Sequence, residues 1–151
     1  MTVLKGTSQA EIAAGIDHCW RVLEDVASAP RWQSGLERVE VVARDAAGRV
    51  SECDAVIDAR FTTVRCRLSV SYDPPHRLEL ARLQSEDLDE LRATWELQSL
   101  PGGMTLATWS VEVDPGPLGP LARPLERVLR PLFVGARARE LARAVQRAPS
   151  C

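Results

Sequence analysis

The sequence predicts an α+β domain in which a curved antiparallel sheet is closed by a long C-terminal helix. The middle of the chain alternates apolar and polar residues between turn signals, with no helical segment between the alternating runs. This pattern is typical of an antiparallel meander. Residues 118–148 instead repeat apolar residues at helical spacing, which indicates an amphipathic helix. An apolar sheet face and an apolar helix stripe bury each other most simply by packing face to face.

The chain is expected to begin with a strand followed by two short helices. Residues 3–14 are predicted to form the strand, which ends before a glycine. Residues 16–27 place their apolar side chains at helical spacing, with Asp17 as the expected N-cap. Pro30 disfavours helix at the residue before it, so a second, short helical turn is expected to carry Trp32.

Further alternating runs are interpreted as strands joined by short turns. They cover residues 36–44, 49–58, 62–72, 77–84, 90–98 and 105–113. The run 62–72 alternates most clearly, and its apolar face holds Val64, Cys66, Leu68, Val70 and Tyr72. The stretches DAAG, YDPPH and LPGG between runs carry the Gly and Pro residues that end strands. Together with the first strand, these runs predict a sheet of about six to seven strands.

The last predicted element is one helix over 118–148. Its apolar stripe consists of Leu118, Leu121, Ala122, Leu125, Leu129, Leu132, Phe133, Ala136, Leu141, Ala144 and Val145. The arginines that lie mostly off that stripe are Arg123, Arg127, Arg130, Arg137, Arg139, Arg143 and Arg147. Pro131 removes one backbone hydrogen bond and is expected to kink the helix.

Several inward-facing strand positions carry small side chains. They are Cys53, Ala55, Cys66, Ala93 and Ala107. Large side chains would fill the space between a curved sheet and a helix, whereas small ones leave room there. The sequence therefore predicts a cavity between the sheet and the C-terminal helix.

Length and composition indicate a globular protein of one domain, residues 1–151. The formal net charge of −2 gives no attraction for nucleic acid or an anionic membrane. No apolar run approaches the ~18 residues of a membrane span, and the N-terminus lacks a secretory apolar core. We expect a cytoplasmic protein with no nucleic-acid partner and no membrane insertion. The positive charge is almost all arginine, a bias that suggests a bacterial origin, and the oligomeric state is left open.

Cysteines and histidines do not cluster. The cysteines are Cys19, Cys53, Cys66 and Cys151. Their spacing forms no C-x-x-C pair, so we expect reduced thiols and no disulfide framework. His18 and His76 are the only histidines, and both are expected to be structural or exposed. The chain shows no metal-ligand spacing and no phosphate loop, so neither a metal nor a cofactor is predicted.

The stretch WRVLEDVASAPRW resembles a family signature. Its Trp20, Leu23, Asp25, Pro30 and Trp32 match the Trp-x-x-Leu-x-Asp-x-x-x-x-Pro-x-Trp pattern of the START-like, birch-pollen-allergen-like helix-grip superfamily (SRPBCC). The polyketide cyclase/dehydrase and lipid-transport branch is the most similar. The stretches YDPPHRLEL and GGMTLATWSVEVDPG resemble a sheet turn and the final strand of that fold. The resemblance implies a helix-grip fold, with the C-terminal helix over the concave face of the sheet.

The resemblance also implies a pocket for a lipid, quinone or polyketide-like molecule. Trp20 is expected to pack in the core, and Trp32 either packs there or borders the pocket mouth. The candidate ligand-binding residues are Trp32, Val64, Cys66, Leu68, Tyr72, Leu80, Arg82, Trp95, Trp109, Leu125, Leu129 and Phe133. Two of them, Tyr72 and Arg82, are polar residues in the apolar phase of their strands. As candidate catalytic residues, Arg82 would hold an enolate oxygen and Tyr72 would donate a proton.

Three functions stay open from the sequence. A binder of a small hydrophobic molecule needs only an apolar cavity. A polyketide cyclase or aromatase-type enzyme needs Arg82 and Tyr72 within reach of one point in that cavity. A protein-interaction module without a ligand needs a filled core and an exposed apolar patch of several hundred Å².

Overall fold

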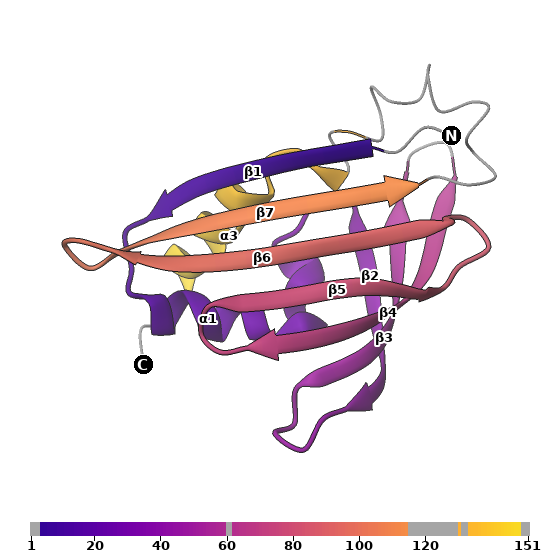
Figure 1. Cartoon of the computed structure of the whole chain (residues 1–151), viewed down its shortest axis with the longest axis horizontal. Coiled ribbons are helices and arrows are strands. Elements are labelled where there is room, and N and C mark those ends of the chain that lie inside the picture. The colour runs from indigo at the N-terminus through magenta and orange to yellow at the C-terminus, as the bar shows by residue number, and fades with distance from the viewer. Residues whose placement is uncertain (1–3, 60–61, 115–129, 131–132, 149–151) are drawn as a thin grey trace.

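The computed structural model describes residues 4–59, 62–114, 130 and 133–148. It contains one antiparallel sheet in the order β1-β7-β6-β5-β4-β3-β2 (Figure 1). The strands are β1 (Leu4–Ile12), β2 (Leu36–Arg44), β3 (Val50–Asp58), β4 (Thr63–Asp73), β5 (Arg77–Gln84), β6 (Glu90–Leu100) and β7 (Met104–Asp114). From β2 to β7 each strand pairs with the next one in the chain, and β7 pairs back onto β1. The predicted meander is confirmed.

Helical segments cover one face of this sheet. They are the helix α1 (Ile16–Glu24), the 3₁₀ helix η1 (Val26–Arg31) and the helix α3 (Arg137–Arg147). Figure 1 shows α1 and α3 behind the same face of the sheet. Helix α3 contacts β1 and β7, α1 contacts β6 and β7, and the two helices contact each other. The two helices thus pack mainly on the part of the sheet formed by β1, β7 and β6.

The start and the end of α1 differ from the sequence expectation. Gly15 is the N-cap, in extended conformation, and no side chain bonds to the free N–H groups of the first turn. Asp17 lies inside that turn, where a carboxylate is favourable beside the positive end of the helix dipole. The predicted Asp17 cap is therefore wrong. The helix ends at Glu24, where Asp25 leaves the helical conformation with a φ of −81° and a ψ of 70°, and the chain then enters η1, which contains Pro30.

The described part of the C-terminal segment is not one continuous helix. Residues 134–136 form a turn, and Gly135 has a φ of 40° there, a conformation that favours glycine. Helix α3 begins only at Arg137. The prediction of an uninterrupted helix over 118–148 is therefore wrong at this turn. The predicted kink at Pro131 lies outside the described residues.

The turn before α3 lies against the first strand. A Cβ atom at Gly6 of β1 would collide with the side chain of Val134, so only glycine allows this close approach. Val134 and Phe133 are both buried, with exposures of 8% and 5%. Strand β1 thus holds the segment that leads into α3 at a fixed distance from the sheet.

Candidate functional site

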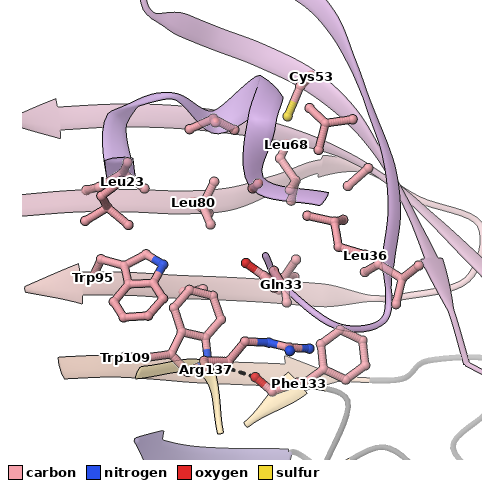
Figure 2. Close-up of a pocket in the computed structure, with 18 of the residues that line it drawn as sticks. Leu23, Gln33, Leu36, Cys53, Leu68, Leu80, Trp95, Trp109, Phe133 and Arg137 are labelled. Carbon is pink, nitrogen blue, oxygen red and sulfur yellow. Dashed lines mark hydrogen bonds between the residues drawn. The ribbon is translucent and has the colours of Figure 1, made fainter. Parts of the chain in front are cut away.

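A partly enclosed pocket lies between the sheet and the helical segments (Figure 2). Strands β2 to β7 supply its floor, because the inward residues of each strand share one face. The other side comes from α1, from η1 with the turn after it, and from residues 133–137. The volume of the cavity is about 90 Å³, counted as the space open to the centre of a water-sized sphere. Its large apolar members include Leu23, Leu36, Leu68, Trp95, Trp109 and Phe133.

Half of the predicted ligand-binding residues line this pocket. They are Trp32, Leu68, Leu80, Trp95, Trp109 and Phe133. Leu125 and Leu129 lie outside the described residues. Val64 and Cys66 are buried in the core from β4 as predicted, but neither is among the residues that line this pocket.

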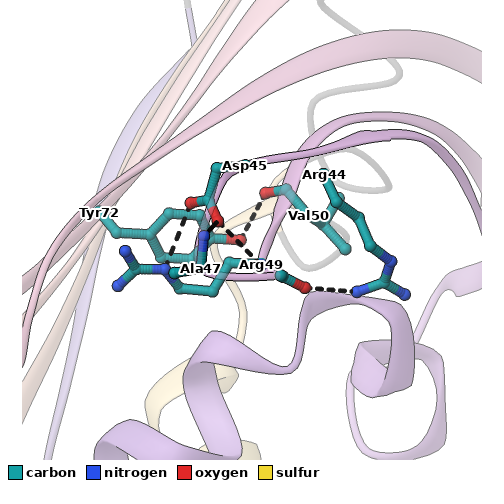
Figure 3. Close-up of polar contacts among 7 residues, drawn as sticks. Arg44, Asp45, Ala47, Arg49, Val50 and Tyr72 are labelled. Carbon is teal, nitrogen blue, oxygen red and sulfur yellow. Dashed lines mark hydrogen bonds and ion pairs between the residues drawn. The ribbon is translucent and has the colours of Figure 1, made fainter.

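Tyr72 belongs to β4, and its side chain packs against the β2–β3 turn and does not line the pocket. Its hydroxyl donates a 2.6 Å hydrogen bond to the Val50 carbonyl oxygen. The Arg49 guanidinium lies 4.9 Å from the centre of its ring (Figure 3), and the ring of Trp20 meets it edge-on at 6.2 Å. Burial, chiefly, raises the pKa of Tyr72 to about 12. The phenol is thus a neutral group that ties β4 to the start of β3.

The same turn is held by Asp45. Its carboxylate accepts hydrogen bonds from the backbone N–H groups of Ala47 and Arg49, at 2.9 and 3.0 Å. Arg49 Nε donates a further bond of 3.3 Å to the other carboxylate oxygen (Figure 3). These donors, led by the Arg49 N–H, lower the pKa of Asp45. The group is therefore structural, and it places Arg49 against the Tyr72 ring.

Arg82 also has backbone partners away from the pocket. Its Nε donates to the Leu88 carbonyl oxygen at 2.7 Å, and its Nη2 donates to the Ser85 carbonyl oxygen at 3.1 Å. Both acceptors belong to the β5–β6 loop. The alternation of β5 predicts this side chain on the apolar face. Because β5 ends at Gln84, the guanidinium instead reaches the carbonyl oxygens of the following loop. Arg82 and Tyr72 do not converge on one point of the pocket.

Two polar residues that the sequence did not single out do line the pocket. They are Gln33, from the turn after η1, and Arg137, from the start of α3, and both are labelled in Figure 2. The Arg137 side chain is only 3% exposed, and its Nη1 donates to Glu140 Oε1 at 2.6 Å and to Ser34 Oγ at 3.2 Å. Glu140 Oε2 in turn accepts the Ser34 backbone N–H at 3.0 Å.

The sequence pattern placed Arg137 mostly off the apolar stripe of the C-terminal helix, because it is charged. In α3, Arg137 precedes Leu141 by four residues and Ala144 by seven, so helical spacing places it on the buried face with Ala138, while Ala136 in the turn is exposed. A glycine followed by a run of helix formers is a signal for the break before α3. Gln33 had no comparable signal, because it lies in an irregular turn after η1.

Three indole rings form a continuous aromatic wall. Trp32 and Trp95 meet at 6.2 Å between ring centres, and Trp95 and Trp109 meet at 5.1 Å. The Trp109 Nε1–H donates a 2.8 Å hydrogen bond to the Phe133 carbonyl oxygen, drawn as a dashed line in Figure 2. The Trp32 Nε1 atom is buried and has no hydrogen-bond partner in the described structure. The wall is thus fixed to the residues that precede α3.

The thiols near the pocket are not activated. Cys53 lines the pocket, and burial raises its pKa to about 11. Burial likewise raises the pKa of Cys66 to about 11. A thiol with so high a pKa is a poor nucleophile at neutral pH, because only the thiolate reacts. Among the described residues, His, Cys, Asp and Glu side chains form no group of three or more that could hold a metal ion.

The pocket and its sheet can be compared with known proteins. A family model described as polyketide cyclase/dehydrase and lipid transport matches residues 4–149. The chain belongs to this family. No functionally curated protein matches the chain. None of the helices within the described residues is long and apolar enough to cross a membrane.

This family member shares its fold with several solved structures. A START superfamily protein from Mycobacterium smegmatis is 18% identical, with a TM-score of 0.71, over 94% of this chain and 97% of that one. The Zhui aromatase/cyclase from a Streptomyces species is 14% identical, with a TM-score of 0.80, over 97% and 95% of the two chains. A protein from Thermus thermophilus is 21% identical, with a TM-score of 0.80, over 95% and 97%. The predicted helix-grip fold is confirmed.

Proposed function

We propose that the protein binds a small hydrophobic molecule, of lipid, quinone or polyketide-like character, in the pocket between the sheet and α3. The observation that carries this proposal is the lining of the pocket. Apart from Gln33 and Arg137, its described members are aliphatic side chains, aromatic side chains and one thiol. Such a surface gains free energy when an apolar molecule replaces water on it.

Binding without catalysis is favoured by the positions of the candidate catalytic residues. Tyr72 and Arg82 each hold backbone carbonyl oxygens outside the pocket lining. The Cys53 thiol in the lining has a raised pKa and is not a ready nucleophile. A cyclase-type enzyme working through Arg82 and Tyr72 would need both groups to leave these partners. A protein-interaction module would need no internal space, whereas this core contains some.

The size of the pocket sets the affinity to expect for a simple probe. One aromatic ring buries roughly 150 Å², and burial is worth about 25 cal/mol per Å². The gross gain is therefore about 4 kcal/mol, from which the costs of association are subtracted. A single-ring hydrocarbon such as ethylbenzene is therefore expected to bind with a Kd of about a millimolar or weaker. The natural ligand must bury more surface to bind tightly.

A pocket-filling substitution tests the proposal. Ala93 lines the pocket from β6, and Ala93→Leu adds bulk inside it. The next residue, Thr94, lies on the opposite face of the same strand, so Thr94→Leu is the matched control. In a ¹H–¹⁵N NMR titration with ethylbenzene, we expect the parent protein and Thr94→Leu to shift at the Trp95 and Trp109 indole N–H signals. Ala93→Leu should reduce the affinity about tenfold, and equal binding by all three proteins would disprove the site.

Mass spectrometry identifies the natural ligand class. Native spectra of the purified protein, followed by organic extraction, are expected to reveal a bound lipid, quinone or polyketide-like molecule. The Ala93→Leu protein should carry less of it than the Thr94→Leu protein does. A bound molecule present in equal amounts in both variants would lie elsewhere on the protein.

A further inference from the structure

The two polar members of the described pocket lining lie at the same end. Arg137 Nη1 is bonded at 3.2 Å to the hydroxyl of Ser34, the residue after Gln33, and Figure 2 draws both lining side chains among apolar ones. They come from distant parts of the chain, the turn after η1 and the first residue of α3. The pocket therefore has a polar end, meaning the part lined by Gln33 and Arg137, and the rest of its described lining is apolar apart from the Cys53 thiol.

Arg137 is fixed in place before any ligand arrives. Its Nη1 is bonded to the Glu140 carboxylate and to the Ser34 hydroxyl, and Glu140 is itself bonded to the Ser34 N–H. Arg137 is 3% exposed, so its long side chain has already lost its rotamer freedom in the folded protein. A group that is held in this way binds a ligand atom at little further entropic cost.

The charge of this end selects among oxygen-bearing ligands. The Glu140 carboxylate lies 2.6 Å from the Arg137 guanidinium, so the pair carries no net charge. A ligand carboxylate at this end would bring an unbalanced negative charge into an apolar site, which is costly. A ketone or quinone oxygen accepts N–H donors without adding charge. The Gln33 amide, a neutral donor, suits the same kind of acceptor.

We propose that Gln33 and Arg137 bind a neutral carbonyl oxygen on an otherwise apolar ligand, and so orient that ligand in the pocket. Glu140 and Ser34 act as positioning residues for Arg137. The inference rests on the proposed function, since it assumes that the pocket takes a small apolar molecule. It adds the chemical group that the ligand presents to the helical side.

Three single-ring probes of similar size separate the possibilities. Acetophenone carries a neutral carbonyl, ethylbenzene carries none, and benzoate carries a carboxylate. In ¹H–¹⁵N NMR titrations of the full chain, we expect acetophenone to bind about five- to tenfold more tightly than ethylbenzene, as one or two neutral hydrogen bonds allow. Benzoate should bind more weakly than acetophenone. The side-chain amide signal of Gln33 should shift with acetophenone and stay in place with ethylbenzene.

Substitutions then locate the donors. Gln33→Leu removes the amide at similar volume. Arg137→Met combined with Glu140→Gln removes both charges together, so no buried carboxylate is left alone, and the glutamine keeps an acceptor for Ser34. In each protein the preference for acetophenone should fall to within about twofold of ethylbenzene. Arg139→Met, on the exposed side of the same helix, is the control and should keep the full preference.

The outcomes separate this inference from the proposed function. If ethylbenzene binds at the indole signals but acetophenone binds no better, the pocket takes apolar molecules and the carbonyl inference is overturned. An unchanged preference in Gln33→Leu and in the double variant also overturns it, as does tighter binding of benzoate. If no probe binds at all, the proposed function itself fails. Should the double variant not fold, Gln33→Leu alone decides.

Discussion

The tryptophans of this protein differ in what their indole N–H groups do. The Trp109 N–H is bonded to the Phe133 carbonyl oxygen in a buried position, whereas the Trp32 N–H is buried with no partner in the described structure. A buried hydrogen bond contributes to stability mainly because breaking it leaves a polar group unsatisfied. The first ring therefore connects the sheet to the segment before α3, and the second contributes through its contact surface alone.

A pair of conservative substitutions measures this difference. Trp109→Phe leaves the Phe133 carbonyl oxygen without its donor, while Trp32→Phe removes an N–H that bonds to nothing described. We expect Trp109→Phe to lower the free energy of unfolding by about 1–3 kcal/mol more than Trp32→Phe does. Urea unfolding followed by circular dichroism provides both values. Equal losses would show that ring volume, rather than the hydrogen bond, decides the cost.

At the scale of the elements, the β5–β6 loop is tied to the sheet by side chains. Arg82 bonds to two of its carbonyl oxygens. The Ser85 hydroxyl donates to the Arg65 carbonyl oxygen at 2.6 Å, and Asp87 accepts the Arg65 N–H at 2.8 Å. These hydrogen bonds fasten the loop to the neighbouring ends of β4 and β5. Arg82 is the residue that binds the loop through a charged side chain from β5.

Removal of this charged side chain should loosen the loop and leave the pocket intact. Arg82→Met keeps much of the apolar stem but loses both hydrogen bonds to Ser85 and Leu88. We expect a loss of about 1.5–3 kcal/mol in the free energy of unfolding, the range for hydrogen bonds from a charged donor. Hydrogen exchange of the amides in residues 85–89 should become faster.

The control for this substitution is Arg92→Met, since Arg92 is an exposed arginine on the neighbouring strand. It should change neither the stability nor the exchange rates by a measurable amount. Ethylbenzene affinity should also be the same in Arg82→Met as in the parent protein. A large loss of affinity in Arg82→Met would instead return Arg82 to the binding site.

The elements also show which features the sequence could predict. Strands β2 and β5 begin and end at the predicted residues, because two-residue alternation and turn residues are local signals. Arg137 was assigned mostly off the apolar stripe because it is charged, although its spacing of four residues from Leu141 and seven from Ala144 was a signal for the buried face of α3. Tyr72 and Arg82 were predicted to share the apolar phase of their strands, but phase does not say whether a polar head meets a ligand or a nearby carbonyl oxygen. The pocket itself followed from small side chains on the inner face.

At the scale of the whole molecule, the fold holds several acidic groups in their neutral form. Burial is the largest cause that raises the pKa of Cys53 and Cys66 to about 11 and the pKa of Tyr72 to about 12. In an unfolded chain, thiols ionise near pH 8.5 and tyrosine near pH 10. At alkaline pH the folded state therefore keeps these protons when the unfolded state has lost them. The free energy of unfolding consequently depends on pH in that range.

The sign of this dependence gives a prediction. Below about pH 8.5 both states hold the protons, so these groups leave stability unchanged there. As pH rises from about 8.5 toward 12, the unfolded state binds fewer protons and the free energy of unfolding falls. Urea unfolding at steps across pH 7–11 should show a flat region followed by a decline. The double variant Cys53→Ala with Cys66→Ala should decline less steeply, and an identical slope in both proteins would contradict the assignment.

The pairing of β1 with β7 has a consequence for the time at which the protein becomes able to bind. Leu4 lies opposite Val113 in this ladder, so β1 gains its partner only after the chain has been synthesised through β7. Chains emerge from the ribosome N-terminal end first, and an incomplete chain lacks Trp109, Phe133 and Arg137. A nascent chain therefore has neither the aromatic wall nor the polar end of the pocket. The proposed pocket can therefore accept a ligand only after β7 and the residues up to Arg137 have folded onto the earlier strands.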